Sequence, residues 1–405
     1  MKITNVEPLV VGAGWRSWIF VKIQTDDGLT GWGECSDARG PEGIAGTIRD
    51  LAPVILGQDP QAYEARFADM ARSLRSSTGG IAAKAMAGIE GALLDIAGQA
   101  LGVSVTRLLG GPTRDRIRLY WSHCGSPRVR RLHEVVGADP IETWDDVTAL
   151  GKEVVARGYT ALKTNILMPG QGATWYSGFD GSMSADDEWV SNKTLAHIET
   201  LVGTLRDAVG PDVDLNLDLN FHFKPEACIR IAQALEPYRL QWLEIDNPDP
   251  DALVRIGDAT RTRICTGETL IHTRGYLPYL QKHAADVFMI DVPWNGVAQA
   301  KKVADLAGVF QHNVAPHNQA SHLATFMSAA LCGVLTNVRI METDVDDVLW
   351  KDQLTTAVPD IVDGYMAIPD APGWGIAINE DVAREHPWTD LNRSMAKNLP
   401  PSKSF

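Results

Sequence analysis

Two patterns of apolar residues follow each other in the first hundred positions of the chain. Residues 2 to about 35 alternate between apolar and polar side chains, with a turn at Asp26-Asp27-Gly28. This alternation predicts a β-meander that contains a hairpin. From about 44 to 102 the period becomes helical, and the alanine-rich segment 81–101 ends at Gly102. We therefore expect an α+β lobe whose last helix carries small residues and packs closely.

Strand-like and helical segments alternate after Gly110-Gly111-Pro112. Eight apolar runs of strand length are found at residues 117–123, 159–166, 213–220, 239–246, 262–268, 286–292, 312–316 and 337–343. Segments with a helical period lie between them, at residues 146–157, 190–209, 225–236, 275–283 and 297–307. The alternation predicts an α/β fold of the (β/α)8 barrel type, with some irregularity in its first and last units.

Three domains follow from these patterns. We expect an α+β capping domain at residues 1–115 and a barrel at residues 116–370. Residues 371–405 are expected to return to the capping domain near Gly373-Trp374-Gly375-Ile376 and to end in a polar tail. The glycine-rich segment 168–187, which carries Trp175, Tyr176 and Phe179, is expected to cover the barrel mouth; a disordered insertion is the alternative.

Composition and charge narrow the choice of partners. The 405 residues are 45% hydrophobic and 22% charged, which is typical of a soluble globular protein. The formal charge of −14 argues against nucleic acid and anionic membranes, since both attract clustered Lys and Arg. The chain shows neither a membrane span nor the apolar core of a signal peptide. Five scattered cysteines without a CxxC pair indicate reduced thiols, so we expect a cytoplasmic protein.

Three acidic residues stand at near-equal intervals, each at the end of a predicted strand. Asp218, Glu244 and Glu268 are separated by 244 − 218 = 26 and 268 − 244 = 24 positions. In a barrel this spacing brings the C-terminal ends of neighbouring strands side by side. Three carboxylates there would repel one another without a cation, and an all-oxygen set of ligands suits Mg²⁺. We therefore predict one Mg²⁺ site at these residues; solvated loop carboxylates are the alternative.

The sixth and seventh predicted strands end in Asp291 and His317. On neighbouring strands the aspartate could hold the imidazole in one tautomer and raise its basicity. A lone histidine at a strand end is more often a structural hydrogen-bonding residue. The coincidence of His317 with Asp291 and the three acids favours a catalytic base.

Four further residues lie at predicted strand ends. Lys163 and Asn165 share one face of the second strand by alternation, Glu342 ends the eighth strand, and His222 follows the third strand. Three of them have a plainer interpretation. Lys163 could be an ion-pair partner of the acids, Asn165 a hydrogen-bond donor and Glu342 a cap of the barrel.

Together these residues resemble the enolase superfamily, and specifically its mandelate racemase subgroup. The resemblance covers nearly the whole chain, including the linker Leu109-Gly110-Gly111-Pro112. The subgroup binds Mg²⁺ through an Asp and two Glu at the ends of the third to fifth strands, which match the three acids above. Its sixth and seventh strands supply an Asp–His dyad, and its eighth supplies an acid near the substrate carboxylate, which matches Glu342.

Two motifs depart from the subgroup. Its second strand usually reads Lys-x-Lys, where this chain has Lys163-Thr164-Asn165. Its fourth strand usually reads Glu-Glu-Pro or Glu-Gln-Pro, where this chain has Glu244-Ile245-Asp246-Asn247-Pro248. Racemisation needs a base on each face of the carbon, and an amide cannot take a proton. A Lys-x-Asn version occurs among the acid-sugar dehydratases, which the chain therefore resembles.

The resemblance implies dehydration of a sugar acid. His317 would remove the proton α to the carboxylate, Mg²⁺ and Lys163 would stabilise the enediolate, and loss of the β-hydroxyl would give a 2-keto-3-deoxy acid. His317, or His222 or Lys163 from the opposite face, would protonate the leaving hydroxyl. The candidates for substrate contacts are Trp15, Arg16 and Asn220. A solvated surface arginine is the alternative for Arg16.

Other functions stay open beside this one. The same site could serve a lactone cycloisomerase or an epimerase. A Schiff-base aldolase would use Lys163 as its nucleophile. A catalytically silent barrel would bind only a metal or a partner protein. The resemblance also suggests a homo-oligomer.

Overall fold

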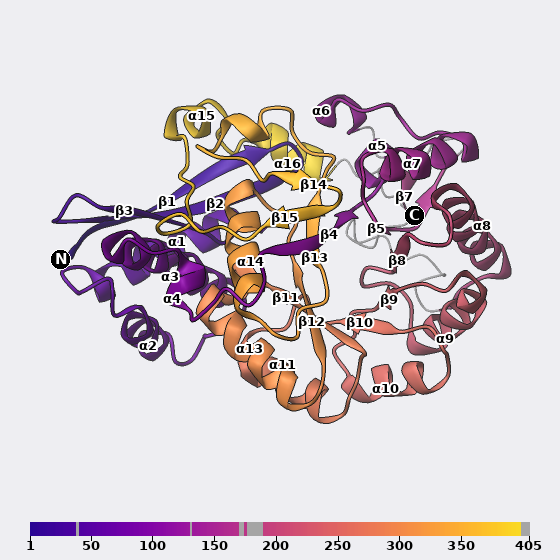
Figure 1. The fold of residues 1–405 in the computed structure, drawn as a ribbon, viewed down its shortest axis with the longest axis horizontal. Coiled ribbons are helices and arrows are strands. Elements are labelled where there is room, and N and C mark those ends of the chain that lie inside the picture. Colours follow the sequence, from indigo (N-terminus) through magenta and orange to yellow (C-terminus); the bar gives the residue numbers. More distant parts are fainter. Residues whose placement is uncertain (38–39, 130–131, 170–173, 176–188, 398–405) are drawn as a thin grey trace.

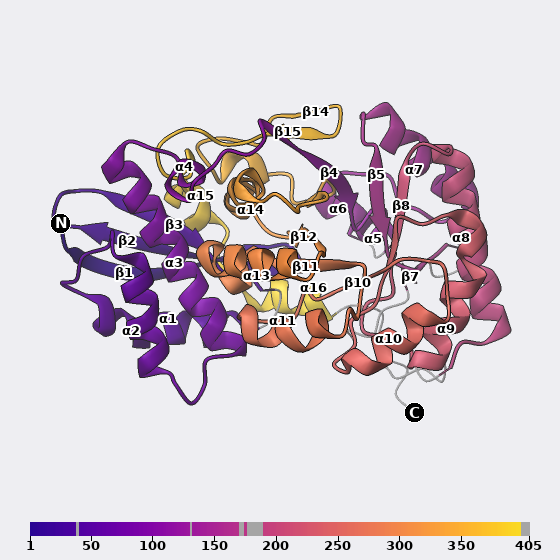
Figure 2. The ribbon, with the colours of Figure 1, turned by 60° about the horizontal axis from the view of Figure 1, so that its bottom comes forward.

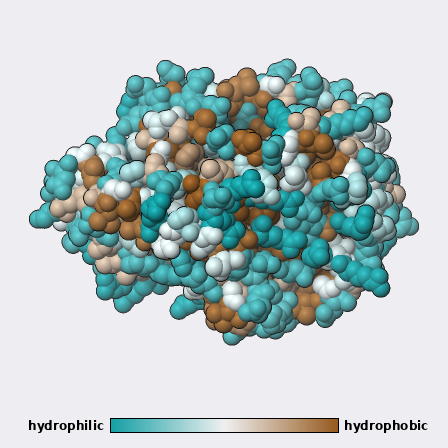
Figure 3. All heavy atoms as spheres, in the orientation of Figure 1, coloured by the Kyte–Doolittle hydropathy of each residue, from teal (hydrophilic) through white to brown (hydrophobic). Residues whose placement is uncertain are grey.

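The computed structural model describes residues 1–37, 40–129, 132–169, 174–175 and 189–397. Figure 1 shows an N-terminal lobe beside a curled sheet that is surrounded by helices. Within the described residues, no helix is both long and apolar enough to cross a membrane. On the face drawn in Figure 3, apolar residues form small separate patches among hydrophilic ones.

The N-terminal lobe is an antiparallel sheet covered by helices. Its strands pair in the order β1 (Ile3–Ala13), β2 (Arg16–Thr25) and β3 (Thr30–Glu34). Its helices are α1 (Pro41–Ile55), α2 (Tyr63–Ser73), α3 (Gly80–Leu101) and α4 (Val105–Leu108). A Cβ atom on Gly33 of β3 would lie 2.0 Å from the backbone oxygen of Gly88 on α3. The predicted meander and the close approach of its last helix are therefore both present.

In the described part of the chain, eight parallel strands form the barrel. They are β4 (Arg116–Ser122), β5 (Ala161–Thr164), β8 (Asp214–Asp218), β9 (Trp242–Glu244), β10 (Ile264–Thr266), β11 (Val287–Asp291), β12 (Asn313–His317) and β13 (Met341–Asp344). Neighbours along the chain pair from β4 to β12, and β13 pairs with β4. Backbone bonds from Val314 N to Asn337 O (3.0 Å) and from Arg339 N to Val314 O (2.9 Å) join the seventh and eighth units. The predicted barrel is confirmed.

Helices connect the barrel strands and cover the outside of the sheet (Figure 2). They are α5 (Ser126–Val129), α6 (His133–Val136), α7 (Trp144–Ala156), α8 (Asn192–Val209), α9 (Pro225–Ala234), η3 (Glu236–Tyr238), α10 (Pro250–Asp258), α11 (His272–Gln281), α12 (Val292–Asn295), α13 (Val297–Val309) and α14 (His322–Val334). Helix α7 begins two residues before the predicted start. Thr143 and Asp146 form a capping box there, in which Asp146 accepts a bond from the Thr143 backbone (2.8 Å).

The last unit of the barrel departs from the regular repeat. After β13 the chain forms a short turn of 3₁₀-helix, η4 (Lys351–Gln353), and two short strands, β14 (Ile361–Val362) and β15 (Tyr365–Ala367). Strand β15 pairs antiparallel with β4. The chain then reaches the N-terminal lobe, where the indole nitrogen of Trp374 donates to Trp32 O (2.9 Å). Figure 1 shows the last helices, α15 (Glu380–Glu385) and α16 (Asp390–Lys397), beside β1 and β2.

The connection between the second and third barrel strands begins with a short antiparallel pair. It consists of β6 (Leu167–Met168) and β7 (Thr174–Trp175). Residues 170–173 and 176–188, which include Tyr176 and Phe179, lie outside the described residues. The expectation that this segment covers the barrel mouth therefore stays a prediction.

Two buried carboxylates fasten the N-terminal lobe to the barrel. Glu34, at the end of β3, accepts bonds from the backbone nitrogens of Ser321 (3.1 Å) and Ala324 (2.9 Å) at the start of α14. Glu90, on α3, accepts bonds from the backbone nitrogen of Ala298 (3.2 Å) and the side chain of Gln299 (3.3 Å) at the start of α13. The first turn of a helix leaves its N–H groups without intrahelical partners, so a carboxylate from the lobe satisfies each start.

Candidate active site

The barrel places the predicted site residues at one level of its C-terminal end. Strand register sets Asp218 beside Glu244 across β8 and β9. It also sets Asp291 beside His317 across β11 and β12. The regular spacing noticed in the sequence therefore corresponds to a single ring of strand ends.

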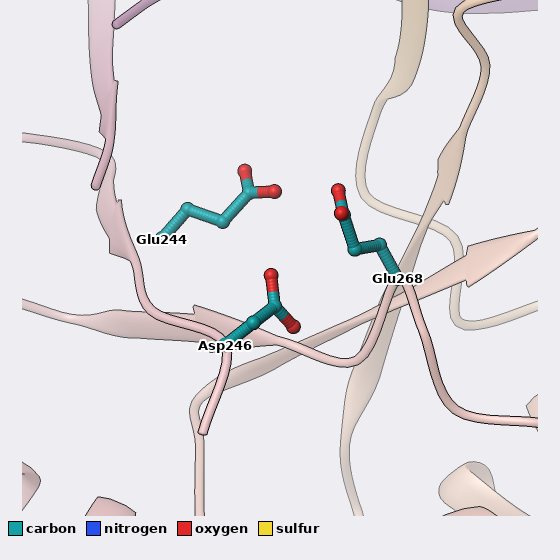
Figure 4. A group of neighbouring side chains, drawn as sticks. All are labelled: Glu244, Asp246 and Glu268. Atoms are coloured by element: carbon teal, nitrogen blue, oxygen red, sulfur yellow. The ribbon is translucent and has the colours of Figure 1, made fainter. Parts of the chain in front are cut away.

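Three carboxylates form a compact group in this ring. One oxygen each from Glu244, Asp246 and Glu268 lies within 4.8 Å of the others, and Figure 4 shows the side chains pointing toward one another. The group shares two members with the predicted metal site and contains Asp246, which the sequence analysis did not assign. Asp246 follows Glu244 by two positions, so strand alternation could have placed both on one face. Its Oδ1 accepts a bond from the backbone nitrogen of Gly267 (3.0 Å).

Asp218 belongs to a neighbouring hydrogen-bonded set. Its carboxylate accepts bonds from the backbone nitrogen of Asn220 (2.6 Å) and from the side-chain amide of Asn165 (3.3 Å). The amide of Asn165 also donates to Asn220 Oδ1 (3.2 Å) and accepts from the Ser126 hydroxyl (2.5 Å). Asn220 has a positive φ of 52°, which turns the chain just after β8 and aims its N–H back at the carboxylate. The structure thus brings Asp218, Asn165 and Asn220 together.

The carboxylate group fits a divalent cation. Glu244 is fully buried, and within the described part of the chain its Oε1 has no hydrogen-bond partner. Burial raises the pKa of Glu244 well above its ordinary value, and the charges of Asp218 and Glu268 add to this effect. Burial likewise raises the pKa of Glu268 to about 8. Glu244 therefore offers a buried oxygen that receives no hydrogen bond, and it lies among carboxylates whose negative charges repel one another. Both features fit a cation that is bound by oxygen ligands.

Lys163 bridges the carboxylate group and the last barrel strand. Its ammonium lies 3.0 Å from Glu244 Oε2 and 3.0 Å from Glu342 Oε1, and the side chain is buried. Burial alone would lower the pKa of Lys163, but these two carboxylates hold it well above its ordinary value. The protonated amine is a poor nucleophile, which argues against the aldolase alternative.

His317 is held between a buried carboxylate and the carboxylate group. Its Nδ1 lies 2.7 Å from Asp291 Oδ2, while its Nε2 lies 3.2 Å from Glu268 Oε2. Burial alone would lower the pKa of His317, but Glu342, Glu268 and Asp291 raise it well above its ordinary value. Asp291 therefore fixes the Nδ1–H tautomer and leaves Nε2 facing the carboxylates.

Glu342 lies across from the dyad. Its carboxylate accepts bonds from the Ser122 hydroxyl and from the backbone nitrogen of Asn318 (2.9 Å), and it is fully buried. Burial by itself would raise the pKa of Glu342, but the cations of Lys163 and His317 lower it to about 2. Glu342 is thus an anion at neutral pH and cannot donate a proton there.

His222, Arg16 and Trp15 make other contacts. His222 is buried in the loop after β8, with its ring 5.8 Å from that of Phe223. Arg16, at the start of β2, lies 2.7 Å from Asp344 Oδ2 and 2.6 Å from Asp347 Oδ2, so both terminal nitrogens bind barrel carboxylates. Its guanidinium carbon is 5.1 Å from the ring centre of half-buried Trp15. Substrate contacts of Arg16, Trp15 and Asn220 stay predictions.

Comparison with known families agrees with this architecture. Residues 4–110 match the profile described as "Mandelate racemase / muconate lactonizing enzyme, N-terminal domain". Residues 146–382 match the profile described as "Enolase C-terminal domain-like". The chain belongs to the mandelate racemase subgroup of the enolase superfamily. The prediction of an enolase-superfamily enzyme is confirmed.

Individual relatives carry related names. A D-xylonate dehydratase of Haloferax volcanii is 28% identical over 390 residues, which cover 95% of this chain and 89% of the relative. A D-mannonate dehydratase of Rhizorhabdus wittichii is 28% identical over 404 residues and covers 96% of each chain. A solved structure from Burkholderia xenovorans, provisionally named an L-alanine-DL-glutamate epimerase and bound to magnesium and fumarate, is 36% identical. It superposes with a TM-score of 0.92 over 97% of this chain and 98% of that one.

Proposed function

We propose that this chain is a Mg²⁺-dependent dehydratase of a sugar acid. The proposal rests on the orientation of the His317 side chain. Asp291 binds its Nδ1, and its Nε2 faces the carboxylate group at 3.2 Å from Glu268 Oε2. A base in this position reaches the α-carbon of a carboxylate substrate that is bound beside the group. The names of the dehydratase relatives support the substrate class.

Mg²⁺ would be held by Glu244, Glu268 and Asp218, with Asp246 supplying a further carboxylate of the same ring. The unpartnered Oε1 of Glu244 and the compact carboxylate group support this assignment, as does the magnesium in the related structure. When bound, the cation supplies positive charge at the substrate carboxylate, where negative charge accumulates as the α-proton leaves. We assign one cation to each site.

The side chains of this protein divide the remaining work. Glu268 is one of the carboxylates that raise the pKa of His317, and a cation held there would offset its charge. The neutral imidazole then takes the α-proton at Nε2, while Asp291 holds Nδ1. Lys163 holds positive charge beside Glu244 and Glu342, where it opposes the charge of the enediolate. His317 then returns the proton to the departing β-hydroxyl, or His222 supplies it from the other side. The enol product ketonises to the 2-keto-3-deoxy acid.

A cycloisomerase or epimerase is the second candidate, and the related structure named an epimerase favours it. Epimerisation by two bases needs a second proton acceptor on the face opposite His317. The amide of Asn165 cannot take that role, and it is bound to Ser126 and Asn220. Lys163 is held by two carboxylates. Asn165 and Lys163 therefore argue against a second base on the second strand, and epimerisation would have to use His222 in that role.

A substrate screen tests the proposal. Mono- and diacid sugars are incubated with the Mg²⁺-loaded protein, and keto-acid release is measured. We expect turnover on a small group of stereochemically related acids and none in the His317→Asn variant. Repeating the reaction in D₂O separates the candidates, because epimerisation returns deuterated starting material instead of a keto acid. Metal binding without turnover on any acid would favour a catalytically silent barrel.

The protein's partners and location are part of the same proposal. We assign a small-molecule carboxylate as the substrate and no nucleic acid or membrane as a partner, in keeping with the charge of −14. All five cysteines are buried and free, which supports the cytoplasm as the location. A homo-oligomer stays a prediction, which light scattering coupled to gel filtration would test.

A further inference from the structure

The indole of Trp294 lies between the Asp291–His317 dyad and the N-terminal lobe. Trp294 belongs to α12, which begins directly after Asp291. Its backbone nitrogen donates to Asp291 Oδ1 (2.8 Å), while His317 binds the other oxygen of the same carboxylate. Its ring centre is 5.9 Å from that of His317, at an angle of 49°. The backbone and the side chain of Trp294 therefore each contact one member of the dyad.

The N-terminal lobe holds this indole from the other side. The indole nitrogen donates to the backbone oxygen of Ser36 (2.7 Å), just after β3. The ammonium of Lys84, on α3, lies 3.7 Å from the ring centre. The side chain is only 9% exposed, so both contacts are shielded from water. A hydrogen bond sets the rotation of the ring in its plane, and a cation on its face resists tilting.

Contacts that do not involve Trp294 also fix the position of α3 relative to it. Glu90, six residues after Lys84, accepts the bond from Ala298 at the start of α13. A Cβ atom on Gly296 would lie 2.4 Å from Glu90 Oε2, so the glycine permits this close approach. Lys84 is itself bonded to the carboxylate of Asp37. The lobe therefore grips the segment that follows Asp291 at two points, one at Trp294 and one at the start of α13.

We propose that Trp294 is a positioning residue through which the N-terminal lobe fixes the geometry of the catalytic dyad. Ser36 and Lys84 hold the indole, and the indole holds the carboxylate and imidazole in register. The lobe then contributes to the orientation of the base. The effect on turnover rests on the proposed function of His317, whereas the coupling of lobe and dyad does not.

Kinetics test the proposal through a graded set of variants. Trp294→Leu removes the ring and is expected to lower kcat about 100-fold with KM within about threefold, since a base displaced by about 1 Å loses that much. Trp294→Phe keeps a ring for Lys84 and His317 and should restore most of this loss. Lys84→Met removes the cation and should lower kcat about 10-fold.

Lys302→Met is the matched control. The Lys302 ammonium lies 2.7 Å from Glu64 Oε2, so it too joins the barrel to the lobe, but through a half-exposed ion pair on α13 and α2. Its loss should leave kcat within twofold. An equal loss of kcat in Lys302→Met and Lys84→Met would show a general loosening of the lobe and would overturn the proposal.

A spectroscopic measurement reads the coupling without any substrate. In ¹⁵N-histidine-labelled protein, the Nδ1 proton of His317 should give a low-field resonance, identified by its absence in His317→Asn. We expect this resonance to shift or broaden in Trp294→Leu and Lys84→Met and to stay unchanged in Lys302→Met. An unchanged resonance in both of the first two variants would overturn the proposal.

Failure of the proposed function and failure of the positioning role of Trp294 give different results. If His317→Asn retains turnover, the proposed function fails while the resonance still tests the coupling. If Trp294→Leu does not fold, Trp294→Phe and Lys84→Met decide by the same measurements. A wild-type kcat in both of these would remove Trp294 from the positioning role.

Discussion

Buried carboxylates occur in two regions of this protein, and they differ in how their oxygens are satisfied. Where the lobe meets the barrel and the C-terminal segment, Glu34, Glu90 and Asp95 accept bonds at both oxygens. At the barrel mouth, Glu244 has an oxygen without a hydrogen-bond partner among the described residues and faces further carboxylates. All of these groups have a raised pKa because of burial.

The comparison shows that burial of an acid alone does not indicate a functional site. Donors from helix starts and loops allow the lobe carboxylates to act as fasteners between segments far apart in the chain. Asp95, for example, accepts from the backbone nitrogens of Trp32 (2.9 Å) and Trp374 (3.0 Å) and so joins the C-terminal segment to the lobe. At the mouth the missing donor leaves a carboxylate oxygen that a cation could bind. The predictions below test this division.

The largest expected effect is at the base. His317→Asn should lower turnover at least about 1000-fold, because general-base catalysis contributes on that scale and an amide cannot accept the α-proton. The measurement is keto-acid release, together with exchange of the α-proton in D₂O. The fold and Mg²⁺ affinity should be retained, as circular dichroism and titration calorimetry would show. Full activity in this variant would remove His317 as the base.

The second largest effect is expected at Glu244, whose Oε1 has no hydrogen-bond partner among the described residues. Glu244→Gln replaces a carboxylate by a neutral amide, and we expect Mg²⁺ affinity to fall on the order of 100-fold or more. Titration calorimetry or the electron paramagnetic resonance of bound Mn²⁺ measures this directly. The comparison variant is Glu34→Gln, which removes an equally buried charge at the lobe contact and should leave metal affinity within twofold. Equal losses of Mg²⁺ affinity in both variants would contradict the distinction between the carboxylates of the lobe contact and those of the barrel mouth.

Variants of two neighbouring acids test which carboxylates at the barrel mouth hold the cation. Asp218→Asn and Asp246→Asn should each lower Mg²⁺ affinity roughly 10-fold. Asp218 matches the family pattern, and Asp246 lies in the compact group with Glu244 and Glu268. Each variant is measured by the same titration. An unchanged affinity would exclude the residue concerned from the set that holds the cation.

The smallest effect on activity is expected at Glu90, where the consequence is for stability. Burial raises the pKa of Glu90 to about 8, so the folded protein keeps a proton that the unfolded chain releases above about pH 4.3. The contribution to stability is present below the unfolded pKa and is lost as pH rises toward 8, by an amount on the order of a few kcal/mol. Glu90→Gln should remove the share of this pH dependence that Glu90 contributes and be the more stable form above pH 8, while other buried acids such as Glu268 still titrate.

Unfolding by urea at pH 5.5 and pH 8.5 measures this difference. Glu64→Gln, at the half-exposed pair with Lys302, is the control and should retain most of the pH dependence of the natural protein, since the charge of Glu64 adds less than burial to the raised pKa of Glu90. Activity at pH 7 should stay within about threefold in both variants. If Glu90→Gln and the natural protein lose stability equally between the two pH values, Glu90 is not the buried acid that titrates.

Local pattern predicted more of the mouth than of the lobe contact. The eight strands were recognised from apolar runs, although some are shorter in the structure: the run 239–246 contains β9 at Trp242–Glu244. Residues just after the end of a strand, such as Asp246, no longer pair with the neighbouring strand and point toward the site. The prediction of one acid at each strand end left Asp246 out. Its spacing from Glu244 was nevertheless visible.

The barrel, the ring of strand ends, and the acids and the dyad found there can all be predicted from the order of residues along the chain. This is possible because a repeated strand–helix unit places each strand end at the same level, so local spacing carries information about distant contacts. Only the tertiary structure decided how Arg16 meets Asp344, 328 positions away, or how Lys84 and Ser36 reach Trp294. Such contacts depend on the packing of one domain on another, which no local period encodes.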